Sequence, residues 1–500
     1  MIDSPVNALL KELLHFDKSS ASSVYIQISQ QIINAIQRGY LTEGTLLPGT
    51  RIFSQLLHIH RKTAVAVYDE LASQGWVEIM ANRGTFVLVP EQKTASIKAG
   101  SNRIGDLNSF AEATGFPFQT SFNLSSTQEF SEAKYELNDG QPDLRLHPIH
   151  EFSKWYGASM KRKSLISNWN YNKKTRYSVF ENQLCNYLNA TRGLHIKPEN
   201  VISTRSTEMS LYIISQLLIR QKDVVLVGDL SNYAANMIFQ QAGAIIKTIP
   251  VDEQGLDVDY IKNHFAKGNI RCVYLCANRN YPTTVSLSVE RRLKLLQLAK
   301  EYQFAIIEDD FDYDFQFEGV AMQPMASANA DGMVIYLGKL GQSLFPSFQT
   351  GFVVAPENLI SEAKNYLQML DRQGDLIREQ MLSELIYEGE IHRLLKKNIL
   401  VYKRRRDFLC QCLEENFKDT IRFKKPTGGL ALWLEFITEI PLVQLSEQAL
   451  KHDLFLPKTI LYQDKDTCAI RLGFGHLNEE EIEILVKKLR QAYDVVTSPK

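Results

Sequence analysis

The sequence lacks the features that mark a secreted, membrane-spanning or metal-binding protein. No apolar run approaches the roughly 18–20 residues that a membrane-spanning helix requires. The first 18 residues carry acidic side chains within their apolar stretch and no small-residue cleavage site, unlike a signal peptide. Six cysteines lie without the paired spacing of a zinc site, at positions 185, 272, 276, 410, 412 and 468. We therefore expect a cytoplasmic protein with reduced thiols, no metal and no membrane partner.

Charge of one sign is not in excess either. The 500 residues carry 56 Lys and Arg against 57 Asp and Glu. Residues 1–90 hold seven basic side chains (11, 18, 38, 51, 61, 62, 83) and seven acidic ones (3, 12, 17, 43, 69, 70, 78). Nucleic-acid binding must therefore be argued from where the charges lie. The length of the chain predicts two or three domains.

The pattern of the first ninety residues predicts helices before a hairpin. Ile28, Ile32 and Ile36 recur every four residues and are followed by Gly39. This spacing predicts an amphipathic helix over 24–38 that ends at the glycine.

Two shorter helices are expected after the turn segment 41–50. Thr50 is placed to cap a helix that runs to about His58. The next helix is expected from about Arg61 to Gln74, before Gly75. The expected inner side chains are Phe53, Leu56 and Leu57 in the first of these helices and Val65, Tyr68 and Leu71 in the second.

Residues 76–89 predict a β-hairpin with its turn at 81–84. Three helices with a tight second connection and then a hairpin are typical of a winged helix-turn-helix. The third helix would contact phosphates and base edges, and the hairpin tip the minor groove, through Arg61, Lys62, Thr63 and Arg83. The alternative is a generic helical cap with solvated charges.

The residues at 47–87, LPGTRIFSQLLHIHRKTAVAVYDELASQGWVEIMANRGTFV, resemble the GntR-type DNA-binding domain. The resemblance implies contacts to double-stranded operator DNA from Arg51, Arg61, Thr63 and Gly84. Two residues depart from the family pattern. His58 replaces a turn glycine, and His60 replaces a common serine before the helix. We expect these departures to affect affinity or sequence preference and not the fold.

A linker over 90–134 separates this DNA-binding domain, residues 1–89, from a larger body. The linker is rich in Ser, Thr, Gly, Asn and Gln and shows no sustained period. In the body, expected buried strands alternate with amphipathic helices, which predicts an α/β fold with a largely parallel sheet covered on both faces. These strands are expected at 224–228, 271–276, 304–309, 333–338 and 351–355. Segments 428–436 and 468–474 predict a smaller α+β lobe.

Six segments resemble the aminotransferase-like half of MocR regulators, which join a GntR-type domain to a pyridoxal-phosphate fold type I body. The segments are NDGQPDLRLHP, PVDEQGLDV, EDDFDYDF, LFPSFQTGF, TGGLALWLEF and IRLGFGHLNEEEI. The resemblance implies an aminotransferase-like domain over 135–500 with a large lobe at about 150–390 and a small lobe at about 400–500. It also implies a homodimer and a route from ligand sensing to transcription.

Several active-site positions of that family are altered in this chain. The lysine that forms the Schiff base with pyridoxal phosphate falls on Gln342, whose amide is not a nucleophile. The phosphate-binding arginine falls on Gln349, and the tyrosine after the acidic pair falls on Phe311. The small phosphate loop is replaced by Arg205, Ser206 and Thr207. Covalent binding of pyridoxal phosphate is therefore not expected.

Other pocket positions match the family. Asp309 matches the carboxylate that holds the ring nitrogen, Arg471 matches the substrate-carboxylate arginine, and Tyr233 matches a pocket aromatic. The alternatives are a solvated or salt-bridged acid at 309 and a structural ion pair at 471. Strand ends carrying Asp309, Asp310 and the loop 338–342 would line the crevice. Lys339 could replace the missing lysine, but an offset of three residues is expected to point its side chain elsewhere.

These observations favour a transcriptional regulator without transaminase activity, whose body dimerises and senses a carboxylate- or amine-bearing, amino-acid-like or vitamin-B6-like molecule. Two other hypotheses remain open at this point. One is a pyridoxal-phosphate-dependent aminotransferase, and the other is a ligand-free scaffold that only pairs the DNA-binding domains.

Overall fold

The computed structural model divides into two compact units, Met1–Thr127 and Gln128–Lys500. The described residues are 5–14, 16, 23–38, 40–42, 44–73, 75–80, 83–88, 114–117, 129, 131–162, 178–329, 331–341, 344, 348–371, 374–463 and 467–498. Most of the expected linker and position 342 lie outside these ranges.

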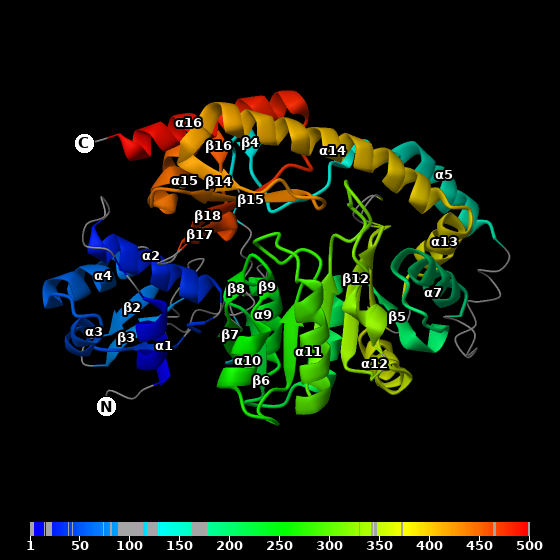
Figure 1. The fold of residues 1–500 in the computed structure, drawn as a ribbon, viewed down its shortest axis with the longest axis horizontal. Helices are drawn as coiled ribbons and strands as arrows, with labels where there is room; N and C mark the ends of the chain where they lie inside the picture. The colour runs from blue at the N-terminus through cyan, green and yellow to red at the C-terminus, as the bar shows by residue number, and fades with distance from the viewer. Residues whose placement is uncertain are drawn as a thin grey trace, which may run out of the picture. The chain divides into compact units, whose positions relative to one another are not determined.

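The first unit packs four helices with a small antiparallel sheet of strand order β1-β3-β2 (Figure 1). Its helices are α1 (Pro5–Leu13), α2 (Val24–Gln37), α3 (Thr50–Leu56) and α4 (Arg61–Ser73). Its strands are β1 (Leu46–Leu47), β2 (Val77–Met80) and β3 (Gly84–Val87), and β2 and β3 form the expected hairpin. Helix α1, which the sequence analysis did not predict, adds the buried Leu10 to the core.

The core of this unit confirms the buried residues predicted for α2 and corrects those predicted for α4. Ile28, Ile32 and Ile36 of α2 are all buried, as expected. In α4, however, Val65 is 40% exposed, so its predicted inward position is wrong. The buried stripe follows the i, i+3, i+4, i+7 spacing of a helix face and consists of Ala64, Val67, Tyr68 and Leu71.

Helix α3 begins one residue earlier than a Thr50 cap would require. Thr50 is its first helical residue, and Gly49 occupies the N-cap position, so the predicted Thr50 cap is wrong. Phe53 and Leu57 are buried as expected, whereas Leu56 is only half-buried.

The second unit is built on a seven-stranded sheet of order β5-β13-β12-β11-β10-β6-β7. All neighbouring strands are parallel except at β13, which is antiparallel to both of its neighbours. The largely parallel sheet predicted from the sequence is thus present with one reversed strand. In sheet order the strands are Val201–Thr204, Thr350–Val354, Val334–Leu340, Ala305–Asp310, Cys272–Leu275, Val224–Gly228 and Ile245–Ile249.

Helices cover both faces of this sheet, as the layers in Figure 1 illustrate. Alternate strand residues such as Ile307 and Leu337 pack under α8 (Thr207–Leu218), α9 (Tyr233–Gln241) and α12 (Glu357–Leu370). Residues such as Ile306 and Val273 pack on the opposite face with α10 (Val258–His264) and α11 (Val289–Tyr302). Helices α5 (Ile149–Met160), α7 (Ser178–Arg192) and α13 (Leu376–Tyr387) contribute to a third apolar cluster, beside β12 and β13. A short hairpin, β8 (Val251–Asp252) with β9 (Gly255–Leu256), follows β7.

The small lobe is α+β, as expected. Its antiparallel sheet has the order β14-β15-β18-β17, with bounds Ile421–Phe423, Ala431–Phe436, Cys468–Gly473 and Leu461–Gln463. The long helix α14 (Glu390–Phe417) packs with α16 (Glu479–Thr497) and α15 (Leu442–Lys451) in one apolar cluster with this sheet.

The chain enters the second unit along the small lobe. Strand β4 (Tyr135–Glu136) pairs in parallel with β16 (Leu454–Phe455). The Lys134 amide donates to Asp453 Oδ1 at 2.9 Å, and the Lys458 amide donates to Glu129 Oε2 at 3.0 Å. The end of the expected linker is therefore hydrogen-bonded to the small lobe.

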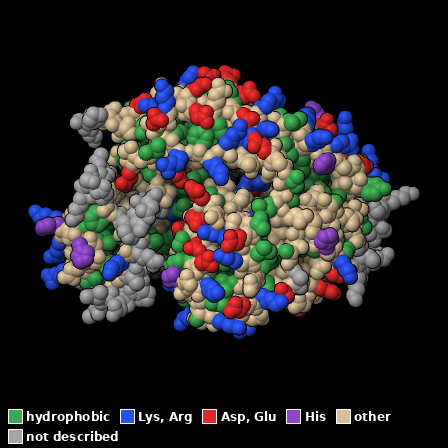
Figure 2. Space-filling model, viewed as in Figure 1, with side chains coloured by type: hydrophobic (Ala, Val, Ile, Leu, Met, Phe, Trp, Pro, Cys, Tyr) green, Lys and Arg blue, Asp and Glu red, His purple; other side chains and the backbone are tan. Residues whose placement is uncertain are grey.

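The surface of the second unit mixes charges of both signs over the visible face (Figure 2), as the balanced composition implies. None of the described helices is both long enough and apolar enough to cross a membrane. Within the described ranges, no group of three or more His, Cys, Asp and Glu side chains could hold a metal ion.

Candidate DNA-binding surface and ligand pocket

The expected DNA-contacting side chains lie at the starts of α3 and α4. Arg51, Arg61 and Lys62 are exposed, and Thr63 is half-buried. The tight connection between the two helices uses His58 at φ 52, a left-handed conformation in which glycine has no steric cost. The family's glycine thus has a physical reason here, and His58 adopts the same turn at some strain.

Buried contacts fix α3 against α4. The Tyr68 hydroxyl donates to the Pro48 carbonyl at 2.5 Å, and its ring stacks on Phe53 with centroids 5.0 Å apart. Because these groups are buried, the two helices present their exposed basic side chains from a rigid base. Burial also raises the pKa of Tyr68 above its usual range, so this hydroxyl remains a donor.

The hairpin tip requires a glycine. Gly84 has φ 118, and a Cβ there would lie 2.6 Å from the Leu46 side chain. Arg83, the residue before it, is exposed. The contacts of these residues with DNA remain predictions.

Asp309, one of the expected pocket residues, lies at the end of β11. Its side chain is buried, and its Oδ2 accepts a hydrogen bond from the Tyr274 hydroxyl at 2.7 Å. Its Oδ1 has no hydrogen-bond partner. Burial raises the pKa of Asp309 to about 7, despite the Tyr274 hydrogen bond and the positive charge of Lys339. Asp309 is therefore neither solvated nor salt-bridged within the described part of the chain, which removes the alternative for this position.

Arg471 lies on β18 and is also buried. Its Nε donates to the Asp139 carbonyl at 2.9 Å, and its Nη1 donates to the Pro282 carbonyl at 2.8 Å. The guanidinium stacks 4.7 Å from the Tyr281 ring and 5.9 Å from the Phe311 ring. No described carboxylate forms an ion pair with it, so the structural ion pair considered for Arg471 is absent from the described residues. Its charge remains available to a carboxylate ligand.

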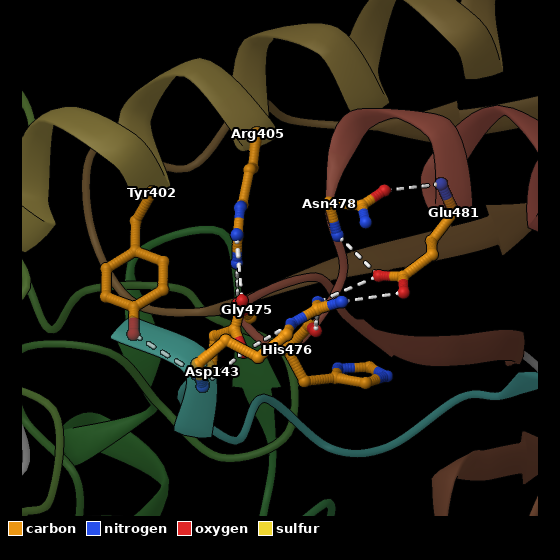
Figure 3. Close-up of polar contacts among 8 residues, drawn as sticks. Asp143, Tyr402, Arg405, Gly475, His476, Asn478 and Glu481 are labelled. Carbon is orange, nitrogen blue, oxygen red and sulfur yellow. Dashed lines mark hydrogen bonds and ion pairs between the residues drawn. The ribbon is translucent and has the colours of Figure 1, made fainter. Parts of the chain in front are cut away.

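The segment that contacts Arg471 is attached to the small lobe by a polar cluster (Figure 3). Asp143 accepts hydrogen bonds from the Arg145 amide and Nε, both at 2.9 Å, and from Arg405 Nη2 at 2.8 Å. Arg145 also binds Glu481 through both oxygens, at 2.8 and 2.9 Å. Burial opposes ionisation of Asp143, but these hydrogen bonds outweigh it and lower its pKa.

The residues expected to replace the phosphate loop, 205–207, lead into α8. Ser206 is the N-cap, and its Oγ accepts from the Met209 amide at 3.2 Å. Thr207 is 8% exposed, and its Oγ1 has no hydrogen-bond partner. Arg205 is half exposed and pairs with Asp371 at 2.6 and 3.1 Å. The loop thus retains a helix N-terminus and one unsatisfied hydroxyl, groups that can bind an anion.

Of the three remaining expected pocket positions, the structure describes 349 and 233. Gln342, the residue expected at the lysine position, lies outside the described residues. Gln349 is half-buried, and its backbone carbonyl accepts from Arg378 Nη1 at 3.3 Å. Tyr233 is the first residue of α9 and half-buried.

Lys339 corrects one expectation. It lies within β12, which extends through Leu340, so residues 338–340 are strand and not loop. Asp309 pairs with Leu337 in a parallel ladder, and Lys339 follows Leu337 by two residues. Because side chains alternate along a strand, Lys339 lies on the same face of the sheet as Asp309.

Sequence reasoning missed Tyr274, although it lies within an expected strand. A tyrosine one residue before the end of a buried strand could have signalled a polar partner for a neighbouring strand-end acid. Arg378, a buried arginine bound to the Gln349 carbonyl, was also missed.

Comparison with known proteins agrees with this description. Residues 24–87 match the family model described as "Bacterial regulatory proteins, gntR family". The chain is 25% identical over 433 residues to the probable rhizopine catabolism regulatory protein MocR of Rhizobium meliloti, covering 85% of this chain and 84% of that protein. It is 24% identical over 479 residues to the uncharacterized HTH-type transcriptional regulator YdeL of Bacillus subtilis (strain 168), covering 94% and 97%.

A solved structure matches the body. The crystal structure of an archaeal alanine:glyoxylate aminotransferase has a TM-score of 0.66 and 26% identity, covering 72% of this chain and 91% of that chain. Together these findings confirm the predicted fold class, a GntR-type winged helix joined to an aminotransferase-like body of pyridoxal-phosphate fold type I. They support a transcriptional regulator over an enzyme, because the full-length relatives are described as regulators.

Proposed function

We propose that this chain, which has the MocR-type architecture, is a homodimeric regulator of transcription whose body binds a small molecule without transaminase activity. The observation that carries the proposal is the unpaired, buried Oδ1 of Asp309. An unsatisfied buried carboxylate oxygen is costly to retain in a protein that only pairs its DNA-binding domains. A ligand with a ring N–H donor would satisfy it.

The described pocket residues fit a pyridoxal-phosphate-like ligand in part. Asp309 Oδ1 suits a protonated pyridine nitrogen, and the N-terminus of α8 with Thr207 Oγ1 suits an anionic group. Arg471 suits a carboxylate. When bound, such a group supplies an electron-withdrawing ring and an aldehyde, but Gln342 cannot condense with that aldehyde. We therefore infer non-covalent binding of a vitamin-B6-like or amino-acid-like molecule.

A physical route connects the pocket to the segment leading toward the DNA-binding domain. Arg471 donates to the carbonyl of Asp139, and the chain before it forms β4 on the small lobe. A carboxylate bound to Arg471 would compete for the guanidinium that now holds Asp139. Occupancy would thus alter the path of residues 135–140, which continue the linker. A cytoplasmic location agrees with six buried cysteines, none of which forms a disulfide.

The test uses the full chain and a DNA fragment that it selects from a random pool. Fluorescence anisotropy would measure DNA affinity with and without pyridoxal phosphate, pyridoxamine phosphate and free amino acids. We expect at least one compound to shift the affinity, and Asp309→Ala with Arg471→Ala to abolish the shift. An equal DNA affinity with and without each compound would refute ligand sensing. It would favour the ligand-free scaffold that only pairs the DNA-binding domains.

Covalent chemistry is tested separately. Borohydride reduction with added pyridoxal phosphate, followed by peptide mass mapping, should leave position 342 unmodified. A pyridoxyl group on Lys339 together with transaminase activity would restore the enzyme hypothesis.

A further inference from the structure

Lys339 lies beside the N-terminus of α8. It pairs with Gly351 on β13, and Gly351 pairs with Thr204 on β5, the strand that leads into α8. Paired residues in adjacent strands share a face. Lys339, Gly351 and Thr204 therefore form one row on the face that also carries Asp309, at the carboxyl ends of β12 and β5.

The residue between the lysine and the helix has no side chain. A Cβ on Gly351 would collide with the Ser206 carbonyl group, so the N-cap of α8 rests directly on this glycine. The Thr204 hydroxyl donates to the same Ser206 carbonyl at 2.8 Å. The residue that caps α8 thus lies against position 351, the neighbour of Lys339 in this row.

The first turn of α8 has unused hydrogen-bonding capacity. Helix α8 has 12 residues and presents the positive end of its dipole here. The Thr207 Oγ1 in this turn has no partner, and the residue is only 8% exposed. This buried hydroxyl is an observation independent of the helix end, and it indicates a polar ligand at this point.

Two of the cations near this turn already have protein partners, and one of them is Arg378, which donates to the Gln349 carbonyl. Arg205 is bound to Asp371 through two hydrogen bonds, and Gln349 carries no charge. Glu208, the next residue of α8, is exposed, and its negative charge raises the pKa of Asp309. No ion pair joins Lys339 to a carboxylate in the described part of the chain, although its charge is felt by Asp309.

We propose that Lys339 binds the phosphate of a pyridine-phosphate ligand together with the N-terminus of α8. It would supply the charge that Gln349 lacks, and it would act as an anion-binding residue instead of forming a covalent bond. The inference rests on the proposed function and names the anionic group of its ligand. In this arrangement Asp309 would bind the ring nitrogen of the ligand. Lys339 would bind its phosphate at the N-terminus of α8.

Pyridoxamine 5′-phosphate is the probe, because it has no aldehyde and cannot form an imine with a lysine. Isothermal calorimetry would compare its Kd with that of pyridoxamine, which lacks the phosphate, for the full chain and for Lys339→Gln. We expect the full chain to prefer the phosphorylated compound. Lys339→Gln should lose about 10- to 100-fold of that preference, the range of a charge-assisted contact, with little change toward pyridoxamine.

Two further variants isolate the role of the charge. Lys339→Arg should keep most of the preference, and Lys247→Gln, an exposed lysine on the edge strand β7, should leave it unchanged. Inorganic phosphate should compete with the probe in the full chain and much less in Lys339→Gln. Thermal unfolding of each variant would verify that the body remains folded.

The outcomes separate the inference from the proposed function. Binding of the probe with an unchanged preference in Lys339→Gln would overturn the role of Lys339 alone. Failure of the unmodified chain to bind either compound would overturn the vitamin-B6 ligand and, with it, this inference. Reduction of a pyridoxal-phosphate adduct onto Lys339 would replace the anion-binding role by a covalent one.

Discussion

Replacing Asp309 by asparagine tests the electrostatics of the pocket without any ligand. The substitution keeps the shape of the side chain and an acceptor for the Tyr274 hydroxyl, and it removes the titratable acid. Burial raises the pKa of Asp309 from 3.8 to about 7. Between these values the folded protein retains a proton that the unfolded chain has already lost. Stability therefore falls as pH rises from about 4 to about 7 and stays lower above it.

The size of this change in stability follows from the two pKa values of Asp309. A difference of about three pH units corresponds to roughly 4 kcal/mol at most. Asparagine avoids this cost at pH 8, but its amide introduces a buried donor that costs about 1–3 kcal/mol when unsatisfied. We expect Asp309→Asn to be more stable than the unmodified chain at pH 8, by about 1–3 kcal/mol, and less stable or equal near pH 4.5.

The assay is urea unfolding from pH 4.5 to 8.5, followed by tryptophan fluorescence. Glu308 and Glu181, whose pKa values burial also raises to about 7, add a slope of the same sign. That slope is present in both proteins, so the difference between them isolates Asp309. A stability difference that does not change with pH would refute the reasoning, because it would mean that Asp309 is ionised in the folded state throughout.

Further predictions concern the DNA-binding surface and the cluster in Figure 3. Arg61→Ala should weaken operator binding by about 1–3 kcal/mol if the side chain reads a base, and unchanged affinity across a salt series would exclude this contact. Arg83→Ala should lose more affinity on A/T-rich than on G/C-rich flanks, and equal losses in gel shifts would contradict a minor-groove hairpin. Residues 1–89 alone should bind the same sites far more weakly than the full chain, because a dimeric body raises the effective concentration of the second DNA-binding domain; comparable gel-shift affinities would show no pairing. Asp143→Asn should lower stability at pH 7 by about 3–5 kcal/mol because it leaves the buried Arg405 without its carboxylate, and an unchanged denaturation midpoint would contradict that role.

Periodicity predicted much of the fold, but it did not settle the exact face of each helix. Ile28, Ile32 and Ile36 of α2 are buried as predicted, and Ile33 and Ala35 beside this stripe are buried as well. In α4, by contrast, Val65 and Ala64 compete for the inner face. The structure buries the small alanine and exposes 40% of the valine, since Tyr68 and Leu71 set the orientation of the helix.

The pocket residues were found by position in the chain, but their relations depend on sheet order. No sequence pattern states that β10 lies beside β11, which is what brings the Tyr274 hydroxyl to Asp309. The same holds for Lys339, whose face follows from its register with Gly351. Long-range pairing of strands is set by the packing of the whole sheet and not by local propensity.

The uninterrupted helix α14 has a mechanical consequence. Its 28 residues form a rod about 42 Å long. Its N-terminal part packs with the apolar side chains of α13, and farther along it holds Asp143 through Arg405. A rod of this length that pivots by about 5° at one end displaces its other end by nearly 4 Å. A small tilt of α14 near α13 would therefore produce a larger displacement in the small lobe, where the chain enters the second unit.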